Sequence, residues 1–414
     1  MSSRVETSKR ALFWNAAGST AGSVQSFVLL ISVTRICGTE IAGSFSVAFA
    51  AAQVLWTIGL FEATSFFATD ATNRFSAEQY LAFKVCSCLL MLVCGFVYVW
   101  IRNLSSFDAL LTIALCCFRL IDAFHEFFYA LFQKNGRLDL SGFSVFCQAI
   151  LSTLVVVLVL LICRNVIVAV ACAAIVKALF LARYDRLMVS RYVPVGFPEF
   201  NKEALVGILI ALLPLFLSTF CANYISNITR FAIEESAFSS QQAVYSALFM
   251  PSFAINLLVL FFLRPSLTIL AEYWKEHNRK SFALEIGKLL FGVIIVSLIV
   301  EAIASIIGIP LLQAMFGLDL SDMLPCLIVL LAGSGIASAS LVLYNVFIVM
   351  RRQRFVLAIY CIVALLCSPI STFFVERSGL MGAAYAYVAI YSLMLALMMG
   401  IFVALYNKGA SAIE

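Results

Sequence analysis

Twelve long apolar runs fill most of this chain of 414 residues, and loops rich in Lys and Arg alternate with loops that carry almost no charge. A helix needs about 20 apolar residues to cross a hydrocarbon core about 30 Å thick. The runs are too long for the strands of a buried sheet. The sequence therefore predicts an all-α polytopic membrane protein, with spans near 11–34, 41–68, 79–100, 107–132, 142–162, 165–183, 205–229, 240–264, 283–306, 323–349, 355–374 and 380–406.

Composition supports the same fold class. Hydrophobic residues make up 63% of the chain and charged residues 12%, whereas soluble domains are about half apolar and a quarter charged. The mean hydropathy is +1.05. The 13 cysteines lack metal-ligand spacing, and with only 2 histidines we expect neither a metal site nor a cofactor.

The cations indicate the orientation, because Lys and Arg in short loops are retained in the cytoplasm during insertion. With the N-terminus inside, 20 cations, Lys84 among them, fall on the cytoplasmic side and 5 on the outer side. We therefore expect a protein of the cytoplasmic membrane with both termini in the cytoplasm. Anionic lipid at the basic rim accounts for the net charge of +5, so no nucleic-acid partner is needed.

Two short echoes suggest that the chain holds two copies of one six-helix unit. Thr34-Arg35 ends the first predicted span and Thr229-Arg230 ends the seventh, and a glutamate follows each arginine by five residues. The runs at 129–132 and 344–347 each begin with Tyr and end with Phe, and an arginine follows each at the same distance.

Parallel six-helix repeats are a common plan of transporters, with the substrate site between the halves. We therefore predict two six-helix bundles around a central cavity. The longest polar connection, 183–203, gives the boundary, so the predicted bundles are 1–190 and 191–414.

Three segments of the first half resemble a known family. They read RICGTEIAGSF at 35–45, IGLFEA at 58–63 and FYALFQKNGRLD at 128–139. These resemble the Wzx-type polysaccharide flippases of the MOP superfamily, which also holds MATE exporters and MurJ-like lipid II flippases. The second half has no clear glycine-rich copy after Arg230. The resemblance implies translocation of a polyprenyl-diphosphate-linked oligosaccharide across the cytoplasmic membrane for surface polysaccharide synthesis.

The fourth predicted span carries Arg119, Asp122, His125 and Glu126 in an otherwise apolar helix. At 100° per residue they form one stripe, about 120° wide and about 10 Å long. An ionised residue at mid-bilayer costs about 2.5–3.5 kcal/mol, so the stripe must face a polar cavity or other helices. Two interpretations remain: an internal ion-pair network that fixes helix packing, or a cavity wall that binds an anionic head group and a coupling proton. Arginine suits phosphate because its guanidinium binds oxygens bidentately.

Other charges lie within or near predicted spans. Lys177 and Glu62 are candidates for the same cavity, although Lys177 has the alternative of extending to the cytoplasmic interface. Arg35, Arg230 and Glu301 are candidates for a rim or a gate, with Arg35 and Arg230 pairing with the glutamates that follow them.

The lengths of the loops and the charges within the spans argue against other functions. Short outer connections disfavour a membrane glycosyltransferase or polymerase, so we do not expect an enzyme. The turn after the second span, 69–74, lacks the glycine- and arginine-rich signature of major-facilitator transporters. A MATE-type cation-coupled multidrug exporter remains the alternative, although a cationic stripe fits cationic drugs poorly. We expect a monomer driven by a proton or sodium gradient or by consumption of its product.

The orientation can be tested by cysteine labelling in a variant without the native cysteines. Single cysteines at Ser105, Asn165 or Asp319 should react with an impermeant maleimide added outside intact cells. Single cysteines at Asn135 or Asn278 should react only after the membrane is permeabilised. The reverse pattern would overturn the orientation.

Overall fold

The computed structural model describes residues 2–69, 74–192 and 195–410, and every regular element in these ranges is a helix. The chain divides into two compact units, Met1–Asn223 (unit 1) and Tyr224–Glu414 (unit 2). The prediction of an all-helical polytopic protein is therefore confirmed. The bundle boundary predicted at 190 stays a prediction, and the division between the units falls inside one long helix.

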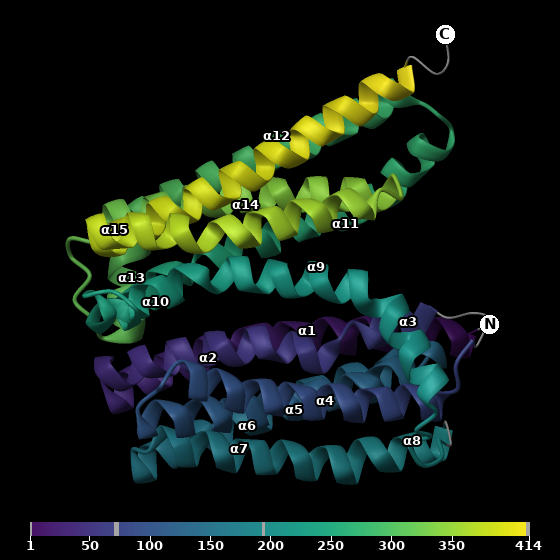
Figure 1. Cartoon of the computed structure of the whole chain (residues 1–414), viewed down its shortest axis with the longest axis horizontal. Helices are drawn as coiled ribbons and strands as arrows, with labels where there is room; N and C mark the ends of the chain where they lie inside the picture. Colours follow the sequence, from purple (N-terminus) through teal and green to yellow (C-terminus); the bar gives the residue numbers. More distant parts are fainter. Residues whose placement is uncertain (1, 70–73, 193–194, 411–414) are drawn as a thin grey trace. The chain divides into compact units, whose positions relative to one another are not determined.

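Unit 1 is a bundle of long helices that run alongside one another, coloured purple to teal in Figure 1. Helix α5 contacts α2, α4, α6 and α7, whereas α1 lies along α6. A π-helical turn, η1 (Leu181–Asp185), joins α7 to α8. The helices are α1 (Ser2–Cys37), α2 (Thr39–Leu60), α3 (Ala63–Thr69), α4 (Ala77–Ile101), α5 (Ser106–Lys134), α6 (Leu138–Cys163), α7 (Val166–Phe180), α8 (Arg186–Tyr192) and the first part of α9 (Lys202–Glu234).

In unit 2, α14 packs against α11, α12 and α15 (green to yellow in Figure 1). Helix α15 is interrupted at Gly379, whose φ of 55° and ψ of −129° are not helical. Beyond the end of α9, the elements are η2 (Ser239–Gln241), α10 (Gln242–Phe249), α11 (Ser252–Lys275), α12 (Arg279–Ile303), η3 (Ala304–Gly308), α13 (Ile309–Phe316), α14 (Leu324–Val349) and α15 (Gln353–Ala410).

Ten helical segments of the described residues are long and apolar enough to cross a membrane. Two features explain the difference from the twelve predicted spans. The segment Gln353–Tyr406 counts once, although its break at Gly379 separates the two predicted spans 355–374 and 380–406. Helix α5 does not count, because Arg119, Asp122 and Glu126 interrupt its apolar sequence. Most of each predicted span is helical, although 41–68 is broken at Phe61 and Glu62 and 240–264 at Met250 and Pro251. The helix that does not count as a span is the one that carries the stripe.

Helices α1 and α6 approach each other closely at two glycines. A Cβ atom on Gly142 would lie 2.4 Å from the carbonyl carbon of Trp14, and one on Gly18 would lie 2.6 Å from the carbonyl oxygen of Gly142. Small residues allow this approach where lipid gives helices no hydrophobic reason to associate. Gln25 of α1 is 7% exposed and adds polar contacts to α6 beside this crossing, because its Nε2 donates to Ala149 O and Ser152 Oγ.

Gly142→Leu should therefore separate α1 from α6 and destabilise unit 1 by about 1–3 kcal/mol or more, as overpacking does. Gly22→Leu in α1 is the matched control, because a Cβ on Gly22 meets no atom within 4 Å. The melting temperatures of the two purified variants in detergent measure the loss of stability. Equal melting temperatures would contradict the close crossing.

Candidate functional site

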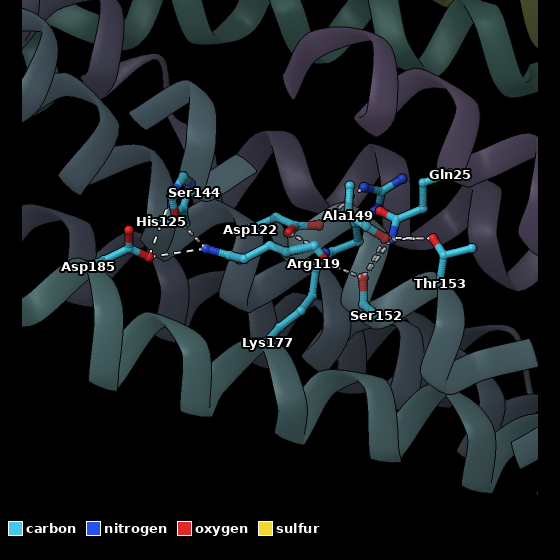
Figure 2. A network of polar contacts seen from close by, with 11 residues as sticks. Gln25, Arg119, Asp122, His125, Ser144, Ala149, Ser152, Thr153, Lys177 and Asp185 are labelled. Carbon is cyan, nitrogen blue, oxygen red and sulfur yellow. Dashed lines mark hydrogen bonds and ion pairs between the residues drawn. The ribbon is translucent and has the colours of Figure 1, made fainter. Parts of the chain in front are cut away.

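Two cations from different helices share one carboxylate at the centre of unit 1 (Figure 2). Arg119 Nη1 in α5 lies 3.2 Å from Asp122 Oδ2 one turn further along, and Lys177 Nζ of α7 donates to the other oxygen, Asp122 Oδ1. The Lys177 side chain is 3% exposed and the Arg119 side chain 11%. Lys177 therefore points into unit 1 and does not extend to an interface. This cluster of three residues carries one positive charge in excess when all three are ionised.

Aromatic rings complete the surroundings of the two cations. The Arg119 guanidinium carbon lies 4.7 Å from the ring centre of Phe49 and 5.2 Å from that of Trp56, both on α2. Lys177 Nζ lies 3.8 Å from the ring centre of Phe118. Ring faces attract cations at such distances. Arg119 Nε and Trp56 Nε1 are nevertheless buried without hydrogen-bond partners among the described residues, so two donors in this region remain unused there.

A second buried group extends the stripe towards the end of α7. His125 Nε2 lies 3.6 Å from Asp185 Oδ2 and 3.0 Å from Ser144 Oγ, and Gln148 Nε2 donates to Asp185 Oδ2 over 3.1 Å. Asp185 and Ser144 are 0% exposed, and Asp185 Oδ1 has no hydrogen-bond partner. The group thus joins α5, α6 and the turn η1, as Figure 2 shows.

The sequence does not predict that Asp185 belongs to this buried group. The prediction ends the sixth span at residue 183, so Asp185 falls in a polar connection, whereas the structure continues helix through η1. Single π-helical turns inside α-helices often mark functional sites. The π-helical turn η1 is thus the structural feature that marks Asp185 as a candidate site residue, and the sequence does not predict this turn.

The sequence places Lys84 among the cations of the cytoplasmic rim, but in the structure Lys84 is 1% exposed. Its assignment to the rim is therefore wrong. Its Nζ donates to the carbonyl oxygens of Gly59 and Leu60, each over 3.0 Å, and Ser87 Oγ also donates to Gly59 O. Helix α2 ends here, and the last carbonyls of a helix lack partners within it. A buried ammonium group therefore caps α2 inside unit 1.

The cap stands at a break in the predicted second span, 41–68. Phe61 and Glu62 both have left-handed backbone, with φ of 45° and 53°. Glu62 Oε1 accepts a hydrogen bond from Thr219 Oγ1 of α9 over 2.9 Å, and the Phe61 ring stacks on Phe216 with centroids 4.1 Å apart. Lys84 also interacts electrostatically with Glu62 and Glu126. Glu62 and Glu126 thus gather near Lys84, whereas Arg119 and Lys177 gather at Asp122.

Three predicted candidates lie outside this charge network. Arg35 is exposed in the last turn of α1, and its assignment to a rim stays a prediction. Glu301 lies near the end of α12 in unit 2, where its carbonyl oxygen accepts from Ser305 Oγ over 2.7 Å. Arg230 lies in α9 within unit 2 and donates to Asn227 Oδ1 over 2.7 Å.

No protein-family model matches this chain, and no curated protein matches it. Solved structures do. An inward-facing multidrug resistance MATE family transporter of the MOP superfamily has a TM-score of 0.76 at 12% identity, over 94% of this chain and 96% of that one. A Vibrio cholerae MATE transporter has a TM-score of 0.64 at 13% identity, over 100% and 99%.

A third structure is described by the polarity of its binding pocket. It is a MOP superfamily transporter from Pyrococcus furiosus in which reverse polarity of the binding pocket suggests a different function. It has a TM-score of 0.62 at 15% identity, over 98% of this chain and 96% of that one. At these identities the three comparisons show the fold: this chain has a MATE-like fold, and its structural neighbours are transporters.

Asp122→Asn should leave Arg119 and Lys177 buried side by side without a counter-charge. Removing one partner of a buried ion pair costs on the order of 3 kcal/mol, so the melting temperature in detergent should fall by several degrees. Asp322→Asn, at an exposed residue, is the control and should change nothing. Adding Lys177→Gln to Asp122→Asn should recover part of the loss; additive losses would show that the two residues are not coupled.

Proposed function

We propose that this chain is a membrane transporter that moves a polyprenyl-diphosphate-linked oligosaccharide from the cytoplasmic to the outer leaflet. The MATE-like fold supports transport, and the resemblance of residues 35–45, 58–63 and 128–139 to polysaccharide flippases supports this substrate class. In this proposal the protein lies in the cytoplasmic membrane with both termini in the cytoplasm, works as a monomer and uses no cofactor.

One observation carries the choice of an anionic substrate: two buried cations, Arg119 and Lys177, share the single carboxylate of Asp122. A guanidinium binds phosphate oxygens through parallel hydrogen bonds, and an ammonium adds a compact charge. Arg119 Nε has no hydrogen-bond partner, so the guanidinium has a donor left for an incoming oxygen. A diphosphate competes with Asp122 for the same two cations, which gives the site an occupied and an empty arrangement.

Control by a proton follows from the same chemistry. Protonation of Asp122 would weaken its hold on Arg119 and Lys177 and make both available to phosphate. His125 beside Asp185 offers a second place for a proton, because imidazole exchanges protons near neutral pH. We therefore propose that a proton controls the affinity of this site for phosphate: protonation of Asp122 favours the bound anion, and loss of the proton restores the ion pairs of Asp122 with Arg119 and Lys177.

A MATE-type cation-coupled multidrug exporter is the second candidate. The fold match favours it, and so do Glu62 and Glu126, two partly buried carboxyl groups that would suit a cationic drug. The two functions differ in the sign of the substrate charge. The first requires free cations when Asp122 is displaced, and the second requires free carboxylates.

Deletion of the gene distinguishes the two candidates in the native host. The flippase proposal expects loss of a surface glycan and accumulation of its lipid-linked precursor on the inner face of the membrane, with little change in sensitivity to cationic dyes. An intact surface glycan together with increased dye retention would favour the exporter.

Arg119 variants test the anionic site in the complemented deletion strain. Arg119→Ala should abolish restoration of the glycan, and Arg119→Lys should restore part of it, because the charge survives while the bidentate geometry is lost. The amount of folded protein, measured by size-exclusion chromatography, separates transport from packing. Arg354→Ala, at an exposed arginine, is the control. Full restoration by folded Arg119→Ala protein would remove this residue from substrate binding.

A further inference from the structure

Unit 2 contains a cation that lies in protein surroundings without a carboxylate partner. Arg230 in α9 is partly buried, and its Nε is fully buried without a hydrogen-bond partner. Its contacts in the described part of the chain are a hydrogen bond from Nη1 to Asn227 Oδ1 over 2.7 Å and the face of Phe249, 4.9 Å from the guanidinium carbon.

Polar aromatic residues lie beside this arginine. Tyr245 is 0% exposed and donates to Thr229 Oγ1 over 2.8 Å, and Tyr387 is 4% exposed. Both rings lie against Phe249, whose face Arg230 contacts: the ring centres of Tyr245 and Tyr387 lie 6.0 Å and 5.1 Å from that of Phe249. Neutral tyrosines and a phenylalanine ring attract a guanidinium but do not neutralise it. In the described part of the chain, the charge on Arg230 is therefore met by an amide oxygen and a ring face.

Arg119 and Arg230 differ in this respect. Arg119 in unit 1 has Asp122 at 3.2 Å, whereas Arg230 in unit 2 has an amide oxygen. A charge taken out of water without a counter-charge is costly, and unpaired charges inside membrane proteins usually face a ligand or a partner. Arg230 therefore has the electrostatics of a site that awaits an anion.

A second unfilled polar group lies on the neighbouring helix. Gln242 is 1% exposed, and neither its Nε2 nor its Oε1 has a hydrogen-bond partner. In α10 it precedes Tyr245 by three residues and Phe249 by seven, so the three share one face of the helix. That face is the one through which α10 meets Thr229 and Arg230. The amide thus supplies a free donor on the side of α10 that faces the arginine.

We propose that Arg230, together with Gln242, forms an anion site in unit 2 that binds a phosphate or diphosphate group. Arg230 would supply its Nε–H and Gln242 its amide N–H groups, which have no hydrogen-bond partner among the described residues. The proposal rests on the proposed function only for the natural ligand, which would be the diphosphate of the lipid-linked substrate. Binding itself is measurable without transport.

The sequence provides a matched control. Thr34-Arg35 and Thr229-Arg230 are the same dipeptide at the ends of two predicted spans, yet Arg35 is exposed and Arg230 is partly buried with a fully buried Nε. Arg35→Gln and Arg230→Gln therefore remove the same charge from the same local sequence. A non-specific effect of net charge on anion binding should appear in both variants.

The experiment measures thermal unfolding of the full-length protein in a neutral detergent, titrated with sodium pyrophosphate at constant ionic strength. Wild-type protein and Arg35→Gln should be stabilised by pyrophosphate to the same extent. Arg230→Gln should raise the apparent Kd at least about tenfold, the loss expected for one charge-assisted contact. Equal stabilisation of Arg230→Gln and wild type, or no stabilisation of wild-type protein, would overturn the proposal.

Two further variants keep the test decisive if Arg230→Gln does not fold. Arg230→Lys keeps the charge and should weaken pyrophosphate binding several-fold, because the fork geometry is lost. Gln242→Leu fills the same space without a polar group, so it should unfold at the same or a higher temperature and yet bind pyrophosphate more weakly. Unchanged pyrophosphate binding in both variants would assign Arg230 to packing alone.

Nanodiscs distinguish the two sources of such an anion. If phosphatidylglycerol competes with pyrophosphate, in comparison with nanodiscs of phosphatidylcholine alone, the site takes lipid head groups; without competition it takes a diphosphate. If pyrophosphate binding depends on Arg230 but deletion of the gene leaves the surface glycan intact, the anion site stands and the proposed function fails. If deletion abolishes the glycan but pyrophosphate binding does not depend on Arg230, the proposed function stands and the anion site fails.

Discussion

The carboxylate of Asp122 is the group on which the interior of unit 1 depends. It brings α5 and α7 together through Lys177 and holds Arg119 against α2. In lipid, helices gain little by burying apolar surface against one another, so polar contacts and close packing determine which helices associate. An ion pair between α5 and α7 therefore specifies a helix neighbour as well as a charge balance. The same contact limits how the stripe can function, because any ligand of Arg119 must replace Asp122 or share with it.

The length and composition of the apolar runs were sufficient to predict the fold, because the thickness of the bilayer fixes the length of a span. The stripe on α5 was also predictable, since the insertion cost of Arg119 and Asp122 requires partners and their spacing of three residues provides one. The sequence leaves two positions for the Lys177 side chain, the cavity and the cytoplasmic interface. The three-dimensional structure shows that Lys177 binds the carboxylate of Asp122.

Lys84, Asp185 and Arg230 show why the remainder was not predictable. Lys84 stands near the start of a span and Asp185 just after one, where charged residues usually face water, and their burial results from helices that end or bend inside unit 1. Arg230 shares its dipeptide with Arg35 and differs from it in burial. Local sequence cannot distinguish the two, because side chains of α10 contact Thr229 and Arg230 within unit 2 and create the difference.

The break between α2 and α3 has a mechanical consequence. Phe61 and Glu62 hold α9 by a stacked ring at Phe216 and a hydrogen bond at Thr219, and these two attachments lie one helical turn apart. A single contact would allow a helix to turn about its own axis, whereas two contacts about 60° apart around it fix both its height and its rotation. Pro214 lies just before these attachments and has no N–H for the helical ladder. Helix α9 is therefore easiest to bend at Pro214, while residues 215–223 of unit 1 must follow the end of α2.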